Sequence, residues 1–161
     1  IKYNRMKDKI KLYCIPYAGG SANIFNQWKS KLKSHVELCP IELAGRGSRM
    51  AEPLYPNLEA AVEDIFTSIE VDISKNDYAF FGHSMGALLV YEILQRIKKL
   101  DIREPLHAFL SGRKPPHILR KKNYSTMSTE MFEEAVMSLG GTPPELFRYP
   151  ELKEIFLPIL R

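Results

Sequence analysis

The sequence predicts an α/β fold in which a mostly parallel sheet is flanked by helices on both faces. From residue 9 to residue 111, short apolar runs rich in β-branched and aromatic residues alternate with segments of helical periodicity. Such alternation is typical of parallel sheets, whose strands are joined by crossover helices. A chain of 161 residues with 45% hydrophobic content can also bury one sizeable core. We therefore expect a single domain over residues 1–161.

The first strand is predicted at residues 9–17 (KIKLYCIPY), which run into the small-residue turn Ala18-Gly19-Gly20-Ser21. A helix is expected over residues 23–32. A second strand-like apolar run follows at residues 36–43 and is closed by the loop Gly45-Arg46-Gly47. The first half of the chain thus has the order strand, helix, strand and loop.

A long amphipathic helix is predicted to begin after Asn57, a residue type that suits the N-cap. Its apolar side chains recur at the spacing of one helical face: Leu58, Ala61, Val62, Ile65 and Ile69. A short buried strand is expected at residues 78–81 (YAFF). A helix is predicted at residues 85–98, and it ends in cations that suit the helix dipole. A further strand is predicted at residues 106–111.

The character of the chain changes after Gly112, because the pattern predicts helices and no further strand. Apolar residues lie at helical spacing (Phe132, Ala135, Val136 and Leu139), a Gly140-Gly141 stop follows, and Pro143-Pro144 begins a new segment. We expect residues 114–161 to form a helical lid or insertion over the sheet. Peripheral packing helices are the alternative.

Composition excludes several classes of protein. The formal net charge is +4, and the basic residues are interspersed with acidic ones, so a nucleic-acid partner is not expected, whereas an acidic protein partner is compatible. No apolar run approaches the length of a membrane span, and none resembles a signal peptide. Cys14 and Cys39 lie in apolar runs without metal or redox spacing, which predicts buried free thiols and a cytoplasmic location.

The segment Gly82-His83-Ser84-Met85-Gly86 matches the G-x-S-x-G nucleophile elbow. It directly follows a predicted buried strand and opens a predicted helix, which is the context that the motif requires. A tight turn without catalytic function is the alternative. The context favours Ser84 as a catalytic nucleophile.

Steric and electrostatic reasons explain these residue types. Side chains at Gly82 or Gly86 would collide with neighbouring backbone in so sharp a turn, and the helix that begins at Met85 directs its positive end at the reacting centre. His83 is adjacent to Ser84, so its imidazole is poorly placed to act as the base. We expect His83 to support the elbow instead.

An acyl-transfer serine also needs an oxyanion hole. In elbows of this kind, the amide after the nucleophile supplies one donor, here Met85, and a loop after an earlier strand supplies the other. The Ala18 amide is the candidate second donor, with Gly19 in reserve; a plain glycine turn is the alternative. Nucleotide binding is not expected, because neither this turn nor the loop at residues 45–47 completes a phosphate-binding glycine motif.

Four segments together resemble the type II thioesterases of nonribosomal peptide and polyketide synthesis, members of the α/β-hydrolase superfamily. They are PYAGGSA (16–22), ELAGRGSR (42–49), GHSMG (82–86) and SGRKPPH (111–117), and they occur in the order of that family. The tail around Leu139-Gly140-Gly141 also resembles the lid region of the family. The resemblance therefore runs through the whole chain.

The resemblance implies an editing enzyme of antibiotic biosynthesis that removes acyl groups from the phosphopantetheine arm of acyl or peptidyl carrier proteins. Ser84 would attack the thioester carbonyl, and the amides of Met85 and Ala18 would hold the oxyanion, with no metal and no cofactor. Gly19 and Arg46 are candidate substrate contacts. Solvated surface charge is the expected role of Arg46 and Arg49, and a contact with the phosphate of the arm is the alternative.

In α/β-hydrolases the triad follows the order serine, acid, histidine. The resemblance implies that the acid and the histidine lie beyond residue 161, so the C-terminal part of the fold is expected to be absent. His107 and His117 are expected to be structural, and a bare 1–161 chain nearly inactive. An incomplete sheet edge predicts self-association. Two alternatives remain open. The chain could belong to another serine esterase or acyltransferase of the same fold, or it could be a non-catalytic fragment that binds carrier proteins.

Overall fold

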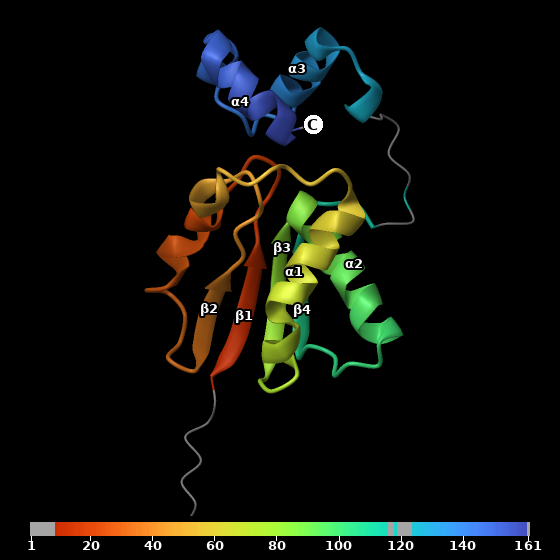
Figure 1. The fold of residues 1–161 in the computed structure, drawn as a ribbon. Helices are drawn as coiled ribbons and strands as arrows, with labels where there is room; N and C mark the ends of the chain where they lie inside the picture. Colours follow the sequence, from red (N-terminus) through yellow and green to blue (C-terminus); the bar gives the residue numbers. More distant parts are fainter. Residues whose placement is uncertain (1–8, 116–117, 119–123, 161) are drawn as a thin grey trace, which may run out of the picture. The chain divides into compact units, whose positions relative to one another are not determined.

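The computed structural model describes residues 9–115, 118 and 124–160 (Figure 1). The chain divides into two compact units, Ile1–Lys114 and Pro115–Arg161. The first unit contains a sheet with its covering helices, and the second is helical.

The sheet of the first unit has four strands in the order β2-β1-β3-β4, and every neighbouring pair is parallel. The strands are β1 (Ile10–Ile15), β2 (Val36–Pro40), β3 (Tyr78–His83) and β4 (His107–Ser111). The four strands lie near the regions that sequence periodicity predicted, which confirms the α/β class. Because parallel strands share one carboxyl edge, the segments that follow β1, β3 and β4 meet at that edge.

One face of the sheet is covered by two α-helices, α1 (Leu58–Ile73) and α2 (Met85–Lys99), as Figure 1 shows. The Asn57 side chain caps α1 by accepting a hydrogen bond of 2.8 Å from the Ala60 amide, so the predicted N-cap is confirmed. The apolar faces of both helices pack on alternate strand residues in the main core, which includes Tyr13, Ile15, Phe80, Ile65, Phe66, Ile69, Leu89, Val90, Ile93 and Ile97.

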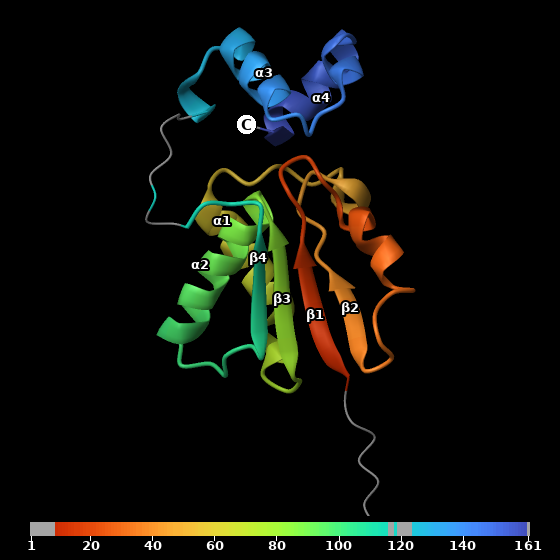
Figure 2. The same ribbon diagram turned by 180° about the vertical axis from the view of Figure 1, so that it is seen from behind.

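The opposite face, seen in Figure 2, carries a smaller cluster beneath the 3₁₀ segment η1 (Ala22–Trp28). The helix predicted over residues 23–32 is therefore shorter and more tightly wound than expected. Its sequence explains the difference, since two asparagines and two aromatic residues are weak helix formers, and Asn26 bonds to the Asn23 side chain. In the described part of this unit, α-helices cover only one face of the sheet.

The edge strand β4 is the most exposed part of the sheet. Phe109 and Leu110 are each about half exposed, and Leu106, which precedes the strand, is exposed as well. The two cysteines are free thiols, Cys14 fully buried and Cys39 partly buried. Burial raises the pKa of Cys14 to about 12, which makes this thiol unreactive at neutral pH.

The second unit contains the short 3₁₀ turns η3 (Tyr124–Thr126) and η4 (Pro144–Phe147) and the helices α3 (Thr129–Ser138) and α4 (Pro150–Leu160). Ser128 caps α3 by accepting a hydrogen bond of 3.3 Å from the Met131 amide. The predicted helical character of this region is confirmed. Among the described residues, no helix has both the length and the hydrophobicity that a membrane span requires.

Candidate active site

Ser84 lies between the last residue of β3 and the first residue of α2. Its backbone has φ +54° and ψ −107°, a conformation that costs an L residue on the order of 1–3 kcal/mol. Ser21 and Ser128, at the starts of other helical segments, have extended backbones and accept capping hydrogen bonds. The Ser84 side chain makes no such bond to the described first turn of α2. A strained backbone and a hydroxyl that makes no capping bond fit a nucleophile better than an N-cap.

The glycines of the elbow are required by close backbone approach. A Cβ at Gly82 would overlap the carbonyl of Gly86, and a Cβ at Gly86 would overlap the carbonyl oxygen of Ile15. The steric role predicted for both glycines is thereby confirmed. The second overlap also shows that the first turn of α2 lies against the end of β1, which brings Met85 close to the loop that begins at Pro16.

The loop after β1 is a tight turn. The Gly20 amide donates a hydrogen bond of 3.0 Å to the Tyr17 carbonyl, and Gly19 has φ +80°, the value found at the third position of a type II turn. Ala18 and Gly19 are partly exposed, whereas Gly20 is buried. The loop therefore presents the backbone of the predicted donor Ala18 at the carboxyl edge of the sheet, the edge that carries Ser84.

Glu42 holds this loop from the next connection along the chain. Its carboxylate accepts a hydrogen bond of 3.0 Å from the Ala22 amide, which anchors the end of the turn to the segment after β2. No role was predicted for this residue from the sequence. A glutamate directly after an apolar strand and before a glycine-rich loop is the signal that could have identified it.

Arg46 is not a solvated surface charge, so that expectation is wrong. The residue is only 7% exposed, and its guanidinium donates a hydrogen bond of 3.3 Å to the Ala44 carbonyl. Burial lowers the pKa of Arg46, although Tyr55 and Glu42 oppose the shift. A contact between Arg46 and substrate stays a prediction.

Arg49 is committed to an ion-pair network. It starts from the short 3₁₀ turn η2 (Gly47–Arg49), and its guanidinium contacts Glu52 at 2.5 Å and Asp64 of α1 at 2.7 Å. Tyr55 donates to the same Asp64 carboxylate and accepts a hydrogen bond of 3.0 Å from the Ala44 amide. The network fastens the loop after β2 to α1, so the charge that was expected to be solvated is partly exposed and paired with two carboxylates.

Asp64 makes this network sensitive to acid. The hydrogen bonds that Arg49 donates hold the pKa of Asp64 below its ordinary value. The ionised Asp64 carboxylate therefore stabilises the fold at pH values above its unfolded pKa of about 3.9. This stabilisation is lost as the pH falls through the lower pKa of the folded state. We expect Asp64→Asn to lower the free energy of unfolding by roughly 1 kcal/mol at pH 7, since both partners are partly exposed. Urea denaturation of the complete gene product at pH 7 and near pH 2 measures the effect, which should vanish at the lower pH.

Asp77→Asn is the matched control for this experiment. Asp77 pairs with Arg103 at 3.0 Å, but both side chains are more than half exposed, so the substitution should change stability by less than about 0.5 kcal/mol. An Asp64→Asn effect no larger than the control, or one that persists at low pH, would contradict the role of the network.

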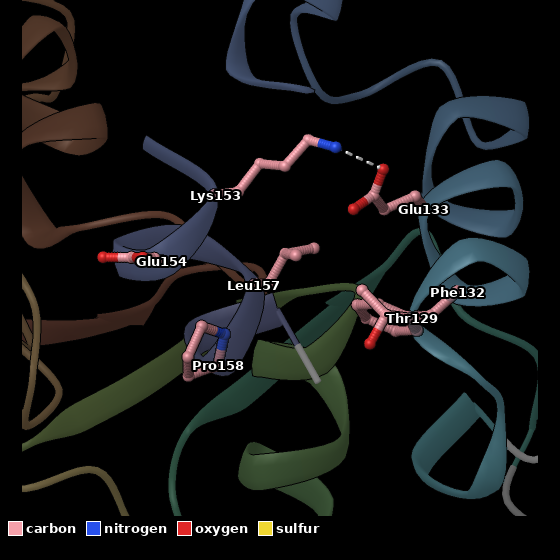
Figure 3. A pocket seen from close by; sticks show the side chains of 7 residues that line it. All are labelled: Thr129, Phe132, Glu133, Lys153, Glu154, Leu157 and Pro158. Carbon is pink, nitrogen blue, oxygen red and sulfur yellow. Dashed lines mark hydrogen bonds and ion pairs between the residues drawn. The ribbon is translucent and has the colours of Figure 1, made fainter. Parts of the chain in front are cut away.

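The helical unit has a pocket of its own, of about 470 Å³ (Figure 3). Its walls come from α3 and α4 and are formed by Thr129, Phe132, Glu133, Lys153, Glu154, Leu157 and Pro158. An ion pair of 2.8 Å joins Lys153 to Glu133 across the two helices. The fully buried Phe132 and the apolar Leu157 and Pro158 make much of this lining hydrophobic.

Two further residues beside the elbow were missed by our sequence analysis. Ser111 and Gly112, at the end of β4, contact His83 and Ser84. The segment 111–117 contributed to the family resemblance, but neither residue was assigned a role. The parallel pairing of β4 with β3 could have identified both residues, because it places the end of β4 beside the elbow.

Comparison with known proteins shows the family to which the chain is related. The chain is 40% identical over 154 residues to the gramicidin S biosynthesis protein GrsT of Aneurinibacillus migulanus, covering 95% of this chain and 60% of GrsT. The crystal structure of ClbQ from the colibactin NRPS/PKS pathway superimposes with a TM-score of 0.85 at 38% identity, over 95% of this chain and 64% of ClbQ. The type II thioesterase YbtT from the yersiniabactin NRPS/PKS pathway gives a TM-score of 0.83 at 25% identity, over 98% of this chain and 63% of YbtT.

The chain thus spans about three fifths of the length of these relatives. The model of the thioesterase domain family matches residues 10–161, which is nearly the whole chain. The resemblance to type II thioesterases is confirmed, and the chain belongs to the thioesterase family.

Proposed function

We propose that the complete gene product containing residues 1–161 is a thioesterase that hydrolyses acyl groups from the phosphopantetheine arm of acyl or peptidyl carrier proteins. The observation that carries the proposal is the strained backbone of Ser84, the central residue of an elbow with a glycine at each end. Strain of this kind persists where function requires it. The names of GrsT and YbtT, which belong to peptide and mixed peptide/polyketide pathways, support the carrier-bound substrate.

The reaction proceeds in two steps on the Ser84 hydroxyl. A base takes its proton while Oγ attacks the thioester carbonyl carbon, and the amides of Met85 and Ala18 donate to the oxyanion that forms. The carbon–sulfur bond then breaks, and the thiol leaves with that proton. Water hydrolyses the acyl-enzyme by the same route, which releases the acid and restores Ser84. In the family order of the triad the acid and the histidine follow the serine, and no residue of 1–161 is assigned as the base.

We also propose that the two units belong to one α/β-hydrolase domain, with residues 114–161 as its lid. The hydrophobic pocket between α3 and α4 supports this role, because an acyl chain needs an apolar surface. Gly19 and Arg46 complete the proposed substrate-binding set. The free thiols fit a cytoplasmic protein. Self-association through the half-exposed β4 edge is a further proposal, supported by Phe109 and Leu110.

The proposed substrate class is tested by comparing acyl-carrier thioesters with p-nitrophenyl esters of the same acyl group. We expect kcat/KM to be at least about 100-fold higher on the carrier thioester, since contacts with the arm and carrier contribute to transition-state binding. The free acyl-pantetheine thioester is the control that separates thioester chemistry from carrier recognition.

Each alternative function gives a different result in this assay. Equal or faster turnover of the oxygen ester would indicate a general serine esterase. Carrier binding without turnover, unchanged by Ser84→Ala, would indicate a non-catalytic carrier-binding protein. Either result would overturn the proposal.

A further inference from the structure

Ser111, the last residue of β4, contacts both central residues of the elbow. Its backbone carbonyl accepts a hydrogen bond of 2.8 Å from the Ser84 amide. Its hydroxyl lies 3.1 Å from Nδ1 of His83, its register partner on β3. The first contact belongs to the backbone and would exist with any residue at this position. The second depends on the side chain, so it can be removed by itself.

The imidazole of His83 is held on two further sides. The ring of Tyr17 meets it edge to face, with centroids 6.0 Å apart and planes at 86°. Gly112 lies so close that a Cβ there would sit 2.9 Å from Nδ1 of His83, and its φ of +66° independently favours glycine. The imidazole therefore fills the space between the loop after β1 and the end of β4.

This position links the two halves of the proposed oxyanion hole. Tyr17 directly precedes Ala18, whose amide is the proposed second donor, and His83 directly precedes Ser84, whose neighbour Met85 supplies the first. Oxyanion donors stabilise a transition state only when they are held in place before the reaction. A side chain that contacts both halves can set their separation.

We propose that Ser111 is a positioning residue: its hydroxyl fixes the His83 imidazole, which in turn holds the loop carrying the Ala18 amide at the correct distance from the Ser84–Met85 elbow. The inference rests on the proposed function and adds to it. Ser111 touches no reacting atom, and its effect passes through His83. Loss of the hydroxyl should therefore impair the chemical step more than substrate binding.

Ser111→Ala tests the proposal in the complete gene product. It removes the hydroxyl and keeps the carbonyl that binds the Ser84 amide. We expect kcat on the carrier thioester to fall about tenfold while KM changes less than about twofold, since small displacements of donors act on the transition state. Ser111→Thr keeps a hydroxyl and should restore kcat to within about threefold of the wild type.

A transition-state analogue gives a second readout. An alkyl boronic acid forms a tetrahedral adduct with a catalytic serine and places an oxygen in the oxyanion hole, so its affinity should fall in parallel with kcat in Ser111→Ala. Ser68→Ala is the matched control, because the Ser68 hydroxyl bonds to the Ile65 carbonyl within α1, away from the elbow. The control should leave kcat, KM and boronic acid affinity unchanged.

A double-mutant cycle tests whether Ser111 acts through His83. We expect Ser111→Ala combined with His83→Ala to lower kcat no further than His83→Ala alone, because the hydroxyl has lost its partner. Three outcomes would each overturn the inference. The first is a double variant whose loss of kcat equals the product of the two single losses, and the second is an unchanged kcat in Ser111→Ala. The third is a Ser111→Thr variant that keeps the wild-type thermal midpoint but does not regain activity. These outcomes leave the proposed function intact as long as Ser84→Ala abolishes turnover; retained turnover in Ser84→Ala would refute the proposed function itself.

Discussion

Replacing Ser84 with alanine is expected to lower kcat of the complete gene product on an acyl-carrier thioester by on the order of a million-fold. The substitution removes the atom that forms the acyl-enzyme, and only substrate binding and oxyanion stabilisation remain. Stability should change little, because the Ser84 side chain makes no capping bond to the described part of α2. Steady-state kinetics, with a mass-spectrometric search for the acyl-enzyme, measure the effect.

Ser74→Ala is the control for this substitution. Ser74 is exposed and follows α1 at the opposite edge of the sheet, where its hydroxyl bonds to the Val71 carbonyl. Its replacement should leave kcat unchanged. A Ser84→Ala variant that retains more than about one hundredth of wild-type turnover, or an acyl group found on another residue, would show that Ser84 is not the nucleophile.

Gly86→Ala is expected to destabilise the protein by about 3 kcal/mol or more, although alanine is the better helix former by about 1 kcal/mol. The added Cβ would overlap the Ile15 carbonyl oxygen and lie 2.7 Å from that of Pro16. Both atoms belong to the backbone at the end of the central strand, so no side-chain rotation relieves the overlap. A glycine-to-alanine change within a helix usually stabilises a protein, but at Gly86 it should destabilise it. Urea denaturation of the complete gene product measures the change.

Gly141→Ala is the matched control. Among the described residues, its two chain neighbours aside, no heavy atom lies within 4 Å of the position that its Cβ would occupy. This substitution should therefore be neutral or stabilise the protein by less than about 1 kcal/mol. If both glycine variants were equally stable, the close approach of α2 to β1 would be disproved, together with the geometry that brings Met85 to the loop after β1.

Local pattern was sufficient to predict the four strands, the two long helices and the elbow. Each has a signal within a few residues: an apolar run for β3, an N-cap and one apolar face for α1, and two glycines around Ser84. The family resemblance rested on four short segments in order. None of these predictions required knowledge of which strands are neighbours.

The remaining features depend on contacts between distant segments. Arg46 looks like a surface charge in sequence, but in the folded loop after β2 it is only 7% exposed and donates to the Ala44 carbonyl. The contact between Ser111 and His83 exists only because β4 pairs in parallel with β3 in one register. Neighbouring residues do not encode such contacts.

The strand order also has a consequence for biosynthesis. β1 is made first, yet it pairs with β3, and about 70 residues separate Lys11 from its partner Tyr78, so at roughly 5–20 residues per second the ribosome needs several seconds to supply that neighbour. During this interval Ile15 at the end of β1 lacks most of its native cover, because it belongs to the main core with residues of α1, β3 and α2. Pairings between such distant segments also fold slowly. The nascent chain should therefore depend on chaperones that shield β1 until β3 emerges.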